Sequence, residues 1–199
     1  MAKIQLQAVP KPMDWHIQPM DWRILTDGGL EINASARTDW FVNPSGKSIA
    51  DNAAALLFDP DPICMLSAYV TVDYHARFDA GVLVIYQNPQ SWAKICLELS
   101  PSNQLMIVSV VTRGKSDDCN SYLVEGKSAF LRIARLERAF AFHASSDGES
   151  WNLIRHFALA EGELKMGFLA QAPTGSGCTV QFSQIKYATE LLEDIRSGN

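Results

Sequence analysis

The sequence predicts an all-β protein, an antiparallel two-sheet β-sandwich, and three observations carry this prediction. Segments in which apolar and polar residues alternate with a period of two follow one another along most of the 199 residues. Gly, Pro, Asn and Asp separate these segments at short intervals, and the helical period is almost absent. Ten or more short strands of this kind are typical of a sandwich. Because no repeat or linker divides the chain, we expect one domain over residues 1–199.

The first part of the chain supplies strands separated by clear turn signals. A Gly-rich turn at 27–29 leads into an alternating strand. The segment 37–42 begins as a strand and breaks at the turn residues 43–46, after which we expect an irregular loop. Alanines at 53–55 are too few to favour a stable helix. A long, half-exposed strand is expected over 64–73.

Three consecutive strands are expected within residues 79–118, and the second of them has the most informative pattern. Two sets of side chains alternate along it, with Ala93, Ile95, Leu97 and Leu99 on one face and Trp92, Lys94, Cys96 and Glu98 on the other. The first face is predicted to be core. The second face, roughly 20 Å long at about 3.3 Å per residue, is predicted to line an open groove.

The second half of the chain contains further predicted strands. They lie over 128–137, on either side of a turn at 147–148 within 139–159, over 165–171 and over 179–187. Residues 190–199 are expected to form a flexible tail. Together with the preceding segments, these strands complete the predicted sandwich.

Composition and charge narrow the possible functions. The formal net charge is −5 and no run of Lys and Arg exceeds two residues, so nucleic acid is not expected as a partner. No apolar run is long enough for a signal peptide or a membrane span, which predicts a cytoplasmic protein without a membrane partner. The four cysteines are widely scattered, so we expect reduced thiols, no metal site and no cofactor.

Several local patterns together resemble one family. They are TDWF at 38–41, DAGVLV at 79–84, SWAKICLEL at 91–99 and SVVTRGKSDD at 109–118. The segments 145–157 and 165–182 are similar to the closing hairpin and last strands of concanavalin A-like sandwiches. The chain resembles the family of unknown function that includes the yeast regulator-of-enolase protein.

This resemblance implies a concanavalin A-like jelly roll, with a concave sheet that holds a carbohydrate in many members of the lectin and glucanase superfamily. The chain departs from the usual family pattern at two positions. Ala80 stands where a glutamine is common, and Asp118 stands where a tryptophan is common. The resemblance therefore implies a groove, but without an aromatic platform at position 118.

The candidate ligand-binding residues lie on the predicted groove or at its rim: Asp39, Trp40, Asp79, Trp92, Lys94, Glu98, Thr112, Ser116, Asp117 and Gln171. Trp92 would offer a stacking surface, and Lys94 and Glu98 would make polar contacts. The alternative for these three residues is a solvated sheet face or a structural salt-bridge network. The remaining polar candidates have a structural alternative, the stabilisation of turns and loops; they are Thr112, Ser116, Asp117 and Gln171.

Two functions from different classes remain open. The first is a non-catalytic binding or regulatory module for a carbohydrate, a sugar phosphate, another metabolite or a protein partner. The second is a glycoside hydrolase that uses Glu98 and a second carboxylate, with Asp39, Asp79 and Asp117 as candidates. The sequence favours the first function, because it contains neither a pair of acids on one strand with hydrolase spacing nor a G-x-S-x-G motif.

Overall fold

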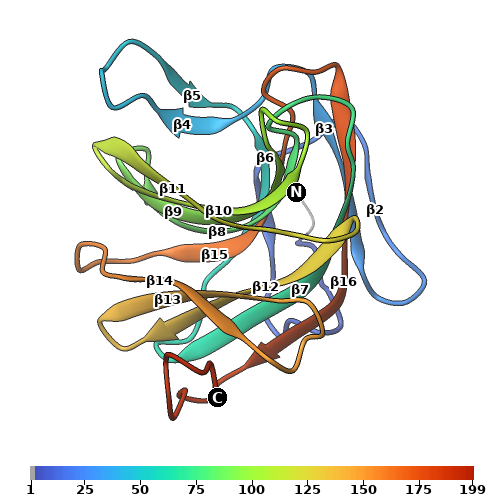
Figure 1. Ribbon diagram of the computed structural model, residues 1–199. Helices are drawn as coiled ribbons and strands as arrows, with labels where there is room; N and C mark the ends of the chain where they lie inside the picture. The colour runs from blue at the N-terminus through green and yellow to red at the C-terminus, as the bar shows by residue number, and fades with distance from the viewer. Residues whose placement is uncertain (1–2) are drawn as a thin grey trace.

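A computed structural model describes residues 3–199, in which antiparallel strands form two large sheets and a small one (Figure 1). The strands of the first sheet are β1 (Asp14–Ile17), β6 (Ala54–Phe58), β8 (Ala80–Asn88), β9 (Ser91–Leu99), β10 (Leu105–Arg113), β11 (Lys115–Leu123) and β15 (Lys165–Gln171). The strands of the second sheet are β2 (Trp22–Ile24), β3 (Leu30–Ser35), β7 (Cys64–Asp73), β12 (Ser128–Leu136), β13 (Ala139–Ser145), β14 (Asn152–Phe157) and β16 (Gly177–Ala188). A hairpin of β4 (Trp40–Val42) and β5 (Ile49–Asp51) forms the third sheet.

The two large sheets face each other as the layers of a sandwich. The first has the order β1-β6-β15-β8-β9-β10-β11, and the second has the order β14-β13-β12-β7-β16-β3-β2. The β4–β5 hairpin lies over the concave side of the first sheet (Figure 1). The predicted all-β, antiparallel two-sheet sandwich is therefore confirmed. No helix in the described residues is long and apolar enough to cross a membrane.

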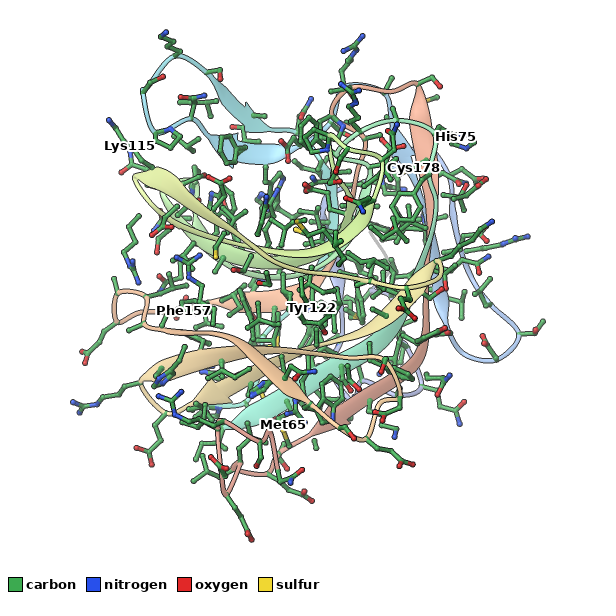
Figure 2. The ribbon with its side chains drawn as sticks, in the orientation of Figure 1. Met65, His75, Lys115, Tyr122, Phe157 and Cys178 are labelled. Atoms are coloured by element: carbon green, nitrogen blue, oxygen red, sulfur yellow. The ribbon has the colours of Figure 1, made fainter. Side chains whose placement is uncertain are left out.

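The main core lies between the two large sheets, where side chains fill the interior (Figure 2). Ala93, Ile95 and Leu97 of β9 point into this core, as the alternation predicts, because neighbouring side chains of a strand point to opposite faces. Gly81 of β8 marks a close approach of the sheets. A Cβ atom at this position would lie 2.7 Å from Cγ1 of Val180, so a larger residue would collide with the facing strand.

A second apolar cluster lies on the concave side of the first sheet, beneath the hairpin. Its members include Trp40, Val42, Trp92, Cys96 and Val110. Both faces of β9 are consequently covered: the exposed fraction is 3% for Trp92 and 2% for Lys94. The predicted open groove is thus partly filled by β4.

One local prediction differs from the structure, and another is confirmed in its pattern of burial. Residues 49–58 form β5 and β6, not an irregular loop, because β6 is buried between β1 and β15 and sheet pairing overrides weak local propensity. Strand β7 alternates as predicted: its inner face lies in the main core, whereas Met65, Tyr69 and Thr71 of its outer face are half-buried and Asp73 is exposed.

The segment 190–199, expected to be a flexible tail, packs against the outer face of the second sheet. Leu192 is buried in a small cluster with Ala134 and Ala141. Arg132 donates a hydrogen bond to the carbonyl oxygen of Gly198 (2.6 Å), and Nε2 of His143 lies 2.8 Å from the carbonyl oxygen of Ile195. Two buried side chains of the sheet therefore anchor this segment.

Candidate functional site

Strand β4 crosses the concave face of the first sheet and is tied to it at both ends. The backbone N–H of Val42 donates a hydrogen bond to Oγ of Ser116 (2.9 Å), and this hydroxyl lies 2.8 Å from Oγ1 of Thr112. Both hydroxyl side chains are buried. Thr112 and Ser116 therefore fix β4 to β10 and β11 and do not offer free hydroxyls to a ligand.

The other end of β4 is held by the buried ammonium group of Lys94. Nζ donates hydrogen bonds to Oδ1 of Asp39 (2.9 Å), to the carbonyl oxygen of Trp40 (2.7 Å) and to Oε1 of Gln171 (2.7 Å). An ammonium group has three donors, so its capacity is used. We call these four residues the Lys94 network. It joins β9, β15 and β4, and leaves Lys94 no free proton for a ligand.

Electrostatics keeps this ammonium group charged despite its burial. Desolvation is the largest single influence and lowers the pKa of Lys94, but the charge and hydrogen bond of Asp39, together with the neighbouring Cys96 and Glu98, outweigh it, and the pKa is raised above its usual value. The side-chain amide of Gln171 also has its hydrogen-bonding groups satisfied within the protein. Its exposed fraction is 1%, and its amide nitrogen donates to the carbonyl oxygen of Phe78 (3.3 Å). Lys94 and Gln171 are therefore structural partners of Asp39.

A cavity of about 440 Å³ lies on one side of β4, and we call it the Glu98 cavity. Its apolar walls are formed by Phe41, Phe78, Pro101, Met106, Val108, Val110 and Pro173. Its polar lining consists of Asp39, Lys94, Glu98, Ser100, Asp118, Asn120 and Gln171. An apolar enclosure with a few converging polar groups is the usual form of a small-molecule site.

The carboxyl group of Glu98 is the most perturbed acid of this cavity. Burial raises its pKa to about 7, the positive charge of Lys94 acts in the opposite direction, and the charges of Asp39 and Asp118 add to the increase. Among residues 3–199, no hydrogen bond reaches the Glu98 side chain, since Lys94 donates to other acceptors. Glu98 is therefore positioned to exchange a hydrogen bond or a proton with a bound molecule.

Asp118, and not Asp117, is the acid of β11 that lines the cavity. The side chain of Asp117 is exposed on the opposite face, where its carboxylate lies 2.9 Å from the guanidinium of Arg155. Strand alternation explains the difference: Asp118 shares its face with Ser116, which contacts β4. Ser116 and Asp118 share a face of β11, so knowledge that Ser116 is buried would have indicated Asp118 as the acid of the cavity. The sequence does not reveal which face of β11 is covered.

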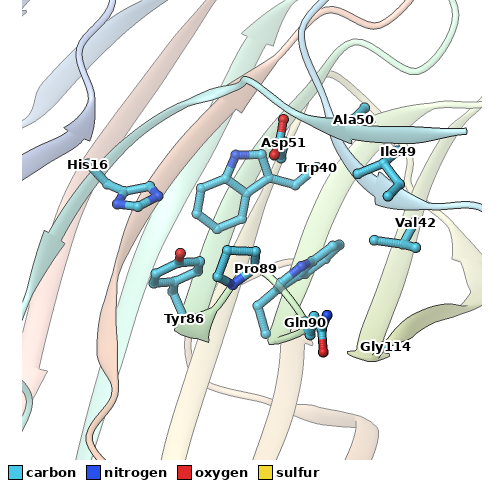
Figure 3. Close-up of a pocket in the computed structure, with 11 residues that line it drawn as sticks. His16, Trp40, Val42, Ile49, Ala50, Asp51, Tyr86, Pro89, Gln90 and Gly114 are labelled. Atoms are coloured by element: carbon cyan, nitrogen blue, oxygen red, sulfur yellow. The ribbon is translucent and has the colours of Figure 1, made fainter.

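On the other side of β4 lies a smaller, aromatic cleft of about 240 Å³, the Trp92 cleft. Figure 3 shows Trp40 near its centre, with His16, Tyr86 and Gln90 around it. The ring centroids of Trp40 and Trp92 are 5.9 Å apart, and those of Trp40 and Tyr86 are 5.2 Å apart. The two indoles pack on each other and are almost fully buried, so they leave little ring surface for stacking on a ligand.

Asp79 does not line either cavity. Its side chain is fully buried, and Oδ2 accepts hydrogen bonds from the backbone N–H groups of His75 (2.9 Å) and Ala76 (2.8 Å). This is the arrangement of a turn held by an aspartate side chain. Of the three candidates for the second carboxylate of a hydrolase, Asp79 and Asp117 are thus outside the Glu98 cavity, and Asp39 lines it.

Comparison with known proteins identifies the family. The sequence model of a family described as a protein of unknown function, DUF1349, matches residues 15–190. The chain belongs to the DUF1349 family. No curated protein matches it.

Several solved structures have the same fold as this DUF1349 protein. A functionally unknown protein from Saccharomyces cerevisiae is 21% identical, with a TM-score of 0.82 over 90% of this chain and 97% of that chain. A GH43 protein from Bacillus licheniformis is 18% identical, with a TM-score of 0.67 over 89% of this chain and 37% of that chain. An alginate lyase from Klebsiella pneumoniae is 11% identical, with a TM-score of 0.56 over 85% of this chain and 84% of that chain.

These likenesses establish a shared fold for the DUF1349 sandwich. This chain spans only 37% of the GH43 protein, so the similarity concerns one part of that enzyme. The predicted site residues separate into three groups. Asp39, Lys94, Glu98 and Gln171 meet at the Glu98 cavity, Trp40 and Trp92 line the Trp92 cleft, and Asp79, Thr112, Ser116 and Asp117 line neither.

Proposed function

We propose that this DUF1349 protein is a non-catalytic binding module whose Glu98 cavity takes a neutral carbohydrate. One observation carries the proposal: unpaired carboxyl groups and apolar walls line the same cavity. Carboxylates of Glu98 and Asp118 are strong acceptors for sugar hydroxyl groups. The rings of Phe41 and Phe78 are apolar surfaces of the kind that pack against the C–H faces of a sugar.

The charge of the lining favours a neutral ligand over a sugar phosphate. Glu98, Asp118 and Asp39 are acidic, and Lys94 is the single cationic residue among the lining residues. Its protons are already donated within the Lys94 network. A phosphate would meet acidic groups without a free cation, and like charges in a desolvated site repel strongly. We therefore narrow the expected ligands to uncharged sugars.

A structural neighbour gives the ligand class independent support. A GH43 glycoside hydrolase, 17% identical with a TM-score of 0.69, is described as an enzyme whose active site was engineered to display both endo-xylanase and exo-arabinofuranosidase activity. This chain matches 38% of that enzyme, so the likeness suggests carbohydrate as a ligand class and assigns no reaction. Neutral plant oligosaccharides are consequently the first probes to use. A regulatory role through a protein partner, suggested by the resemblance to the yeast regulator-of-enolase protein, stays a prediction.

Glycoside hydrolysis is the second candidate, and the raised pKa of Glu98 favours it. A carboxyl group with a pKa of about 7 suits a general acid, and Asp118 lines the same cavity. Asp39 is the less suitable partner, because it is paired with Lys94. A hydrolase of this design would use Glu98 as the acid and Asp118 as the base or nucleophile.

Isothermal titration calorimetry with xylo-, cello- and malto-oligosaccharides tests the proposal. We expect at least one series to bind, with Glu98→Gln and Asp118→Asn weakening binding by about tenfold or more, which corresponds to about 1.4 kcal/mol. Asp117→Asn is the matched control, because Asp117 adjoins Asp118 but points away from the cavity. Absence of binding in all three series, or equal binding by the wild type and both cavity variants, would overturn the proposal. Release of shorter products would instead establish hydrolysis.

A further inference from the structure

The backbone at Phe78, in the loop before β8, has a conformation that its residue type disfavours. Its φ angle is 70°, in the left-handed region, where the Cβ atom of any residue except glycine is crowded. Positive φ angles occur at five residues other than glycine among residues 3–199: Arg37, Phe78, Asn103, Glu137 and Gln184. Phe78 is the one aromatic residue of this set and the one member that lines the Glu98 cavity.

Hydrogen bonds on both sides of Phe78 impose this conformation. Its backbone N–H donates to the carbonyl oxygen of Leu99 (2.7 Å), and its carbonyl oxygen accepts from the side-chain amide of Gln171 (3.3 Å). The preceding carbonyl oxygen, that of Arg77, accepts from Oγ1 of Thr174 (2.6 Å). A strained conformation persists only where its surroundings hold it, and here β9, β15 and the loop after β15 do so.

Asp79, a sequence candidate that lines neither cavity, holds the same loop from the other side. Its buried carboxylate accepts hydrogen bonds from the backbone N–H groups of His75 (2.9 Å) and Ala76 (2.8 Å). Its own backbone N–H donates to the carbonyl oxygen of Ala76 (3.3 Å). Asp79 and Gln171 of the Lys94 network are therefore positioning residues, because together they fix the loop that carries Phe78.

The ring of Phe78 fills no apolar core that would explain this strain. Among residues 3–199, it belongs to none of the three apolar clusters, whereas Phe41, the other aromatic residue of the lining, packs against the cluster beneath the hairpin. The Phe78 side chain is half-buried at the wall of the Glu98 cavity. A residue that strains the backbone without filling a core is typical of a functional position, where ligand binding and not stability determines the residue.

We propose that Phe78 is the stacking residue of the Glu98 cavity, and that the strained loop holds its ring in place before a sugar binds. This inference rests on the proposed function and assigns the stacking contact to one residue of the lining. An apolar C–H face of a sugar packs on an aromatic ring. Because the loop is fixed without a ligand, the ring is already ordered when a sugar binds, which favours affinity.

Substitutions of Phe78 separate the contribution of the ring from that of the backbone. Phe78→Ala and Phe78→Gly both remove the ring, so calorimetry with whichever oligosaccharide series binds should show at least about tenfold weaker binding by each. Phe78→Tyr keeps the ring and should stay within about threefold of the wild type. Only glycine adopts a φ of 70° without strain, so Phe78→Gly should unfold at a higher urea concentration than Phe78→Ala.

Arg37→Gly is the matched control for the backbone change. It relieves a φ of 60° at a residue that lines neither cavity, so it should bind the same sugar as the wild type does. Binding by Phe78→Ala within about threefold of the wild type, in a series that Glu98→Gln binds about tenfold more weakly, would refute stacking on Phe78. That result would leave the carbohydrate-binding function standing.

The remaining outcomes also separate the inference from the proposed function. A Phe78→Gly protein no more stable than Phe78→Ala would refute the strain. Loss of folding in Phe78→Gly would show that the ring is needed for the core, which likewise refutes the inference. If none of the three oligosaccharide series binds to the wild type, the inference and the proposed function are both refuted.

Discussion

Replacement of Lys94 by methionine tests whether the Lys94 network fixes β4 on the sheet. The substitution keeps the apolar stem and removes the ammonium group, which leaves three acceptors without their donor: Oδ1 of Asp39, the carbonyl oxygen of Trp40 and Oε1 of Gln171. Removal of one partner of a buried ion pair typically costs about 3 to 5 kcal/mol. Asp39 retains some solvent contact, with 22% of its side chain exposed, so we expect a loss of about 3 kcal/mol.

Urea unfolding followed by tryptophan fluorescence measures this loss. Lys115→Met is the matched control, because Lys115 is an exposed residue of β11 in the same sheet, and it should change the free energy of unfolding by less than about 0.5 kcal/mol. The double variant Lys94→Met with Asp39→Asn should recover part of the loss, since it also removes the unpaired charge. A Lys94→Met protein within about 1 kcal/mol of the wild type would refute the structural role that we assign to this network.

Three further outcomes follow from individual residues. Ile95→Ala should lower the free energy of unfolding by about 2 to 5 kcal/mol in urea titrations, because Ile95 lies in the main core, and a loss below 1 kcal/mol would contradict that position. Burial lowers the pKa of His143 to about 4, so stability should fall as the pH decreases from about 6.5 through 4, and His143→Gln should flatten this profile in acid titrations of unfolding. Because the pKa of Glu98 is raised to about 7, sugar binding should strengthen as the pH increases from 6 to 8, and calorimetry on Glu98→Gln should show no such dependence.

The sandwich could be predicted from the sequence because period-two alternation directly reports which face of a strand is buried. Ile95 and Leu97 point into the main core as predicted, and the segment 165–171 coincides with β15. The structural salt-bridge network that the sequence left open as an alternative is present as the pair of Lys94 with Asp39, since a buried amine requires a nearby acid. These features depend on strand periodicity and on simple charge pairing.

The position of β4 could not be predicted, because a strand of three residues has almost no periodic signal. Its place depends on bonds between residues far apart in sequence, such as Val42 with Ser116 and Asp39 with Lys94. This strand divides the predicted groove and separates Trp92 from Glu98. The choice between Asp117 and Asp118 depends in turn on β4, because contact with β4 determines which face of β11 is covered.

Two-dimensional ¹H–¹⁵N NMR during titration with xylobiose, or with the disaccharide of whichever series binds, tests the central claim most directly. Binding in the Glu98 cavity should shift the backbone amide signals of Phe78, Asp118 and Asn120, whereas those of Tyr86 and Gln90 at the Trp92 cleft should remain in place. Asp117→Asn should reproduce the wild-type titration, and Glu98→Gln should need about tenfold more sugar to reach the same shifts. Shifts confined to the Trp92 cleft, or the same shifts in Glu98→Gln, would contradict the assignment of the Glu98 cavity as the carbohydrate site.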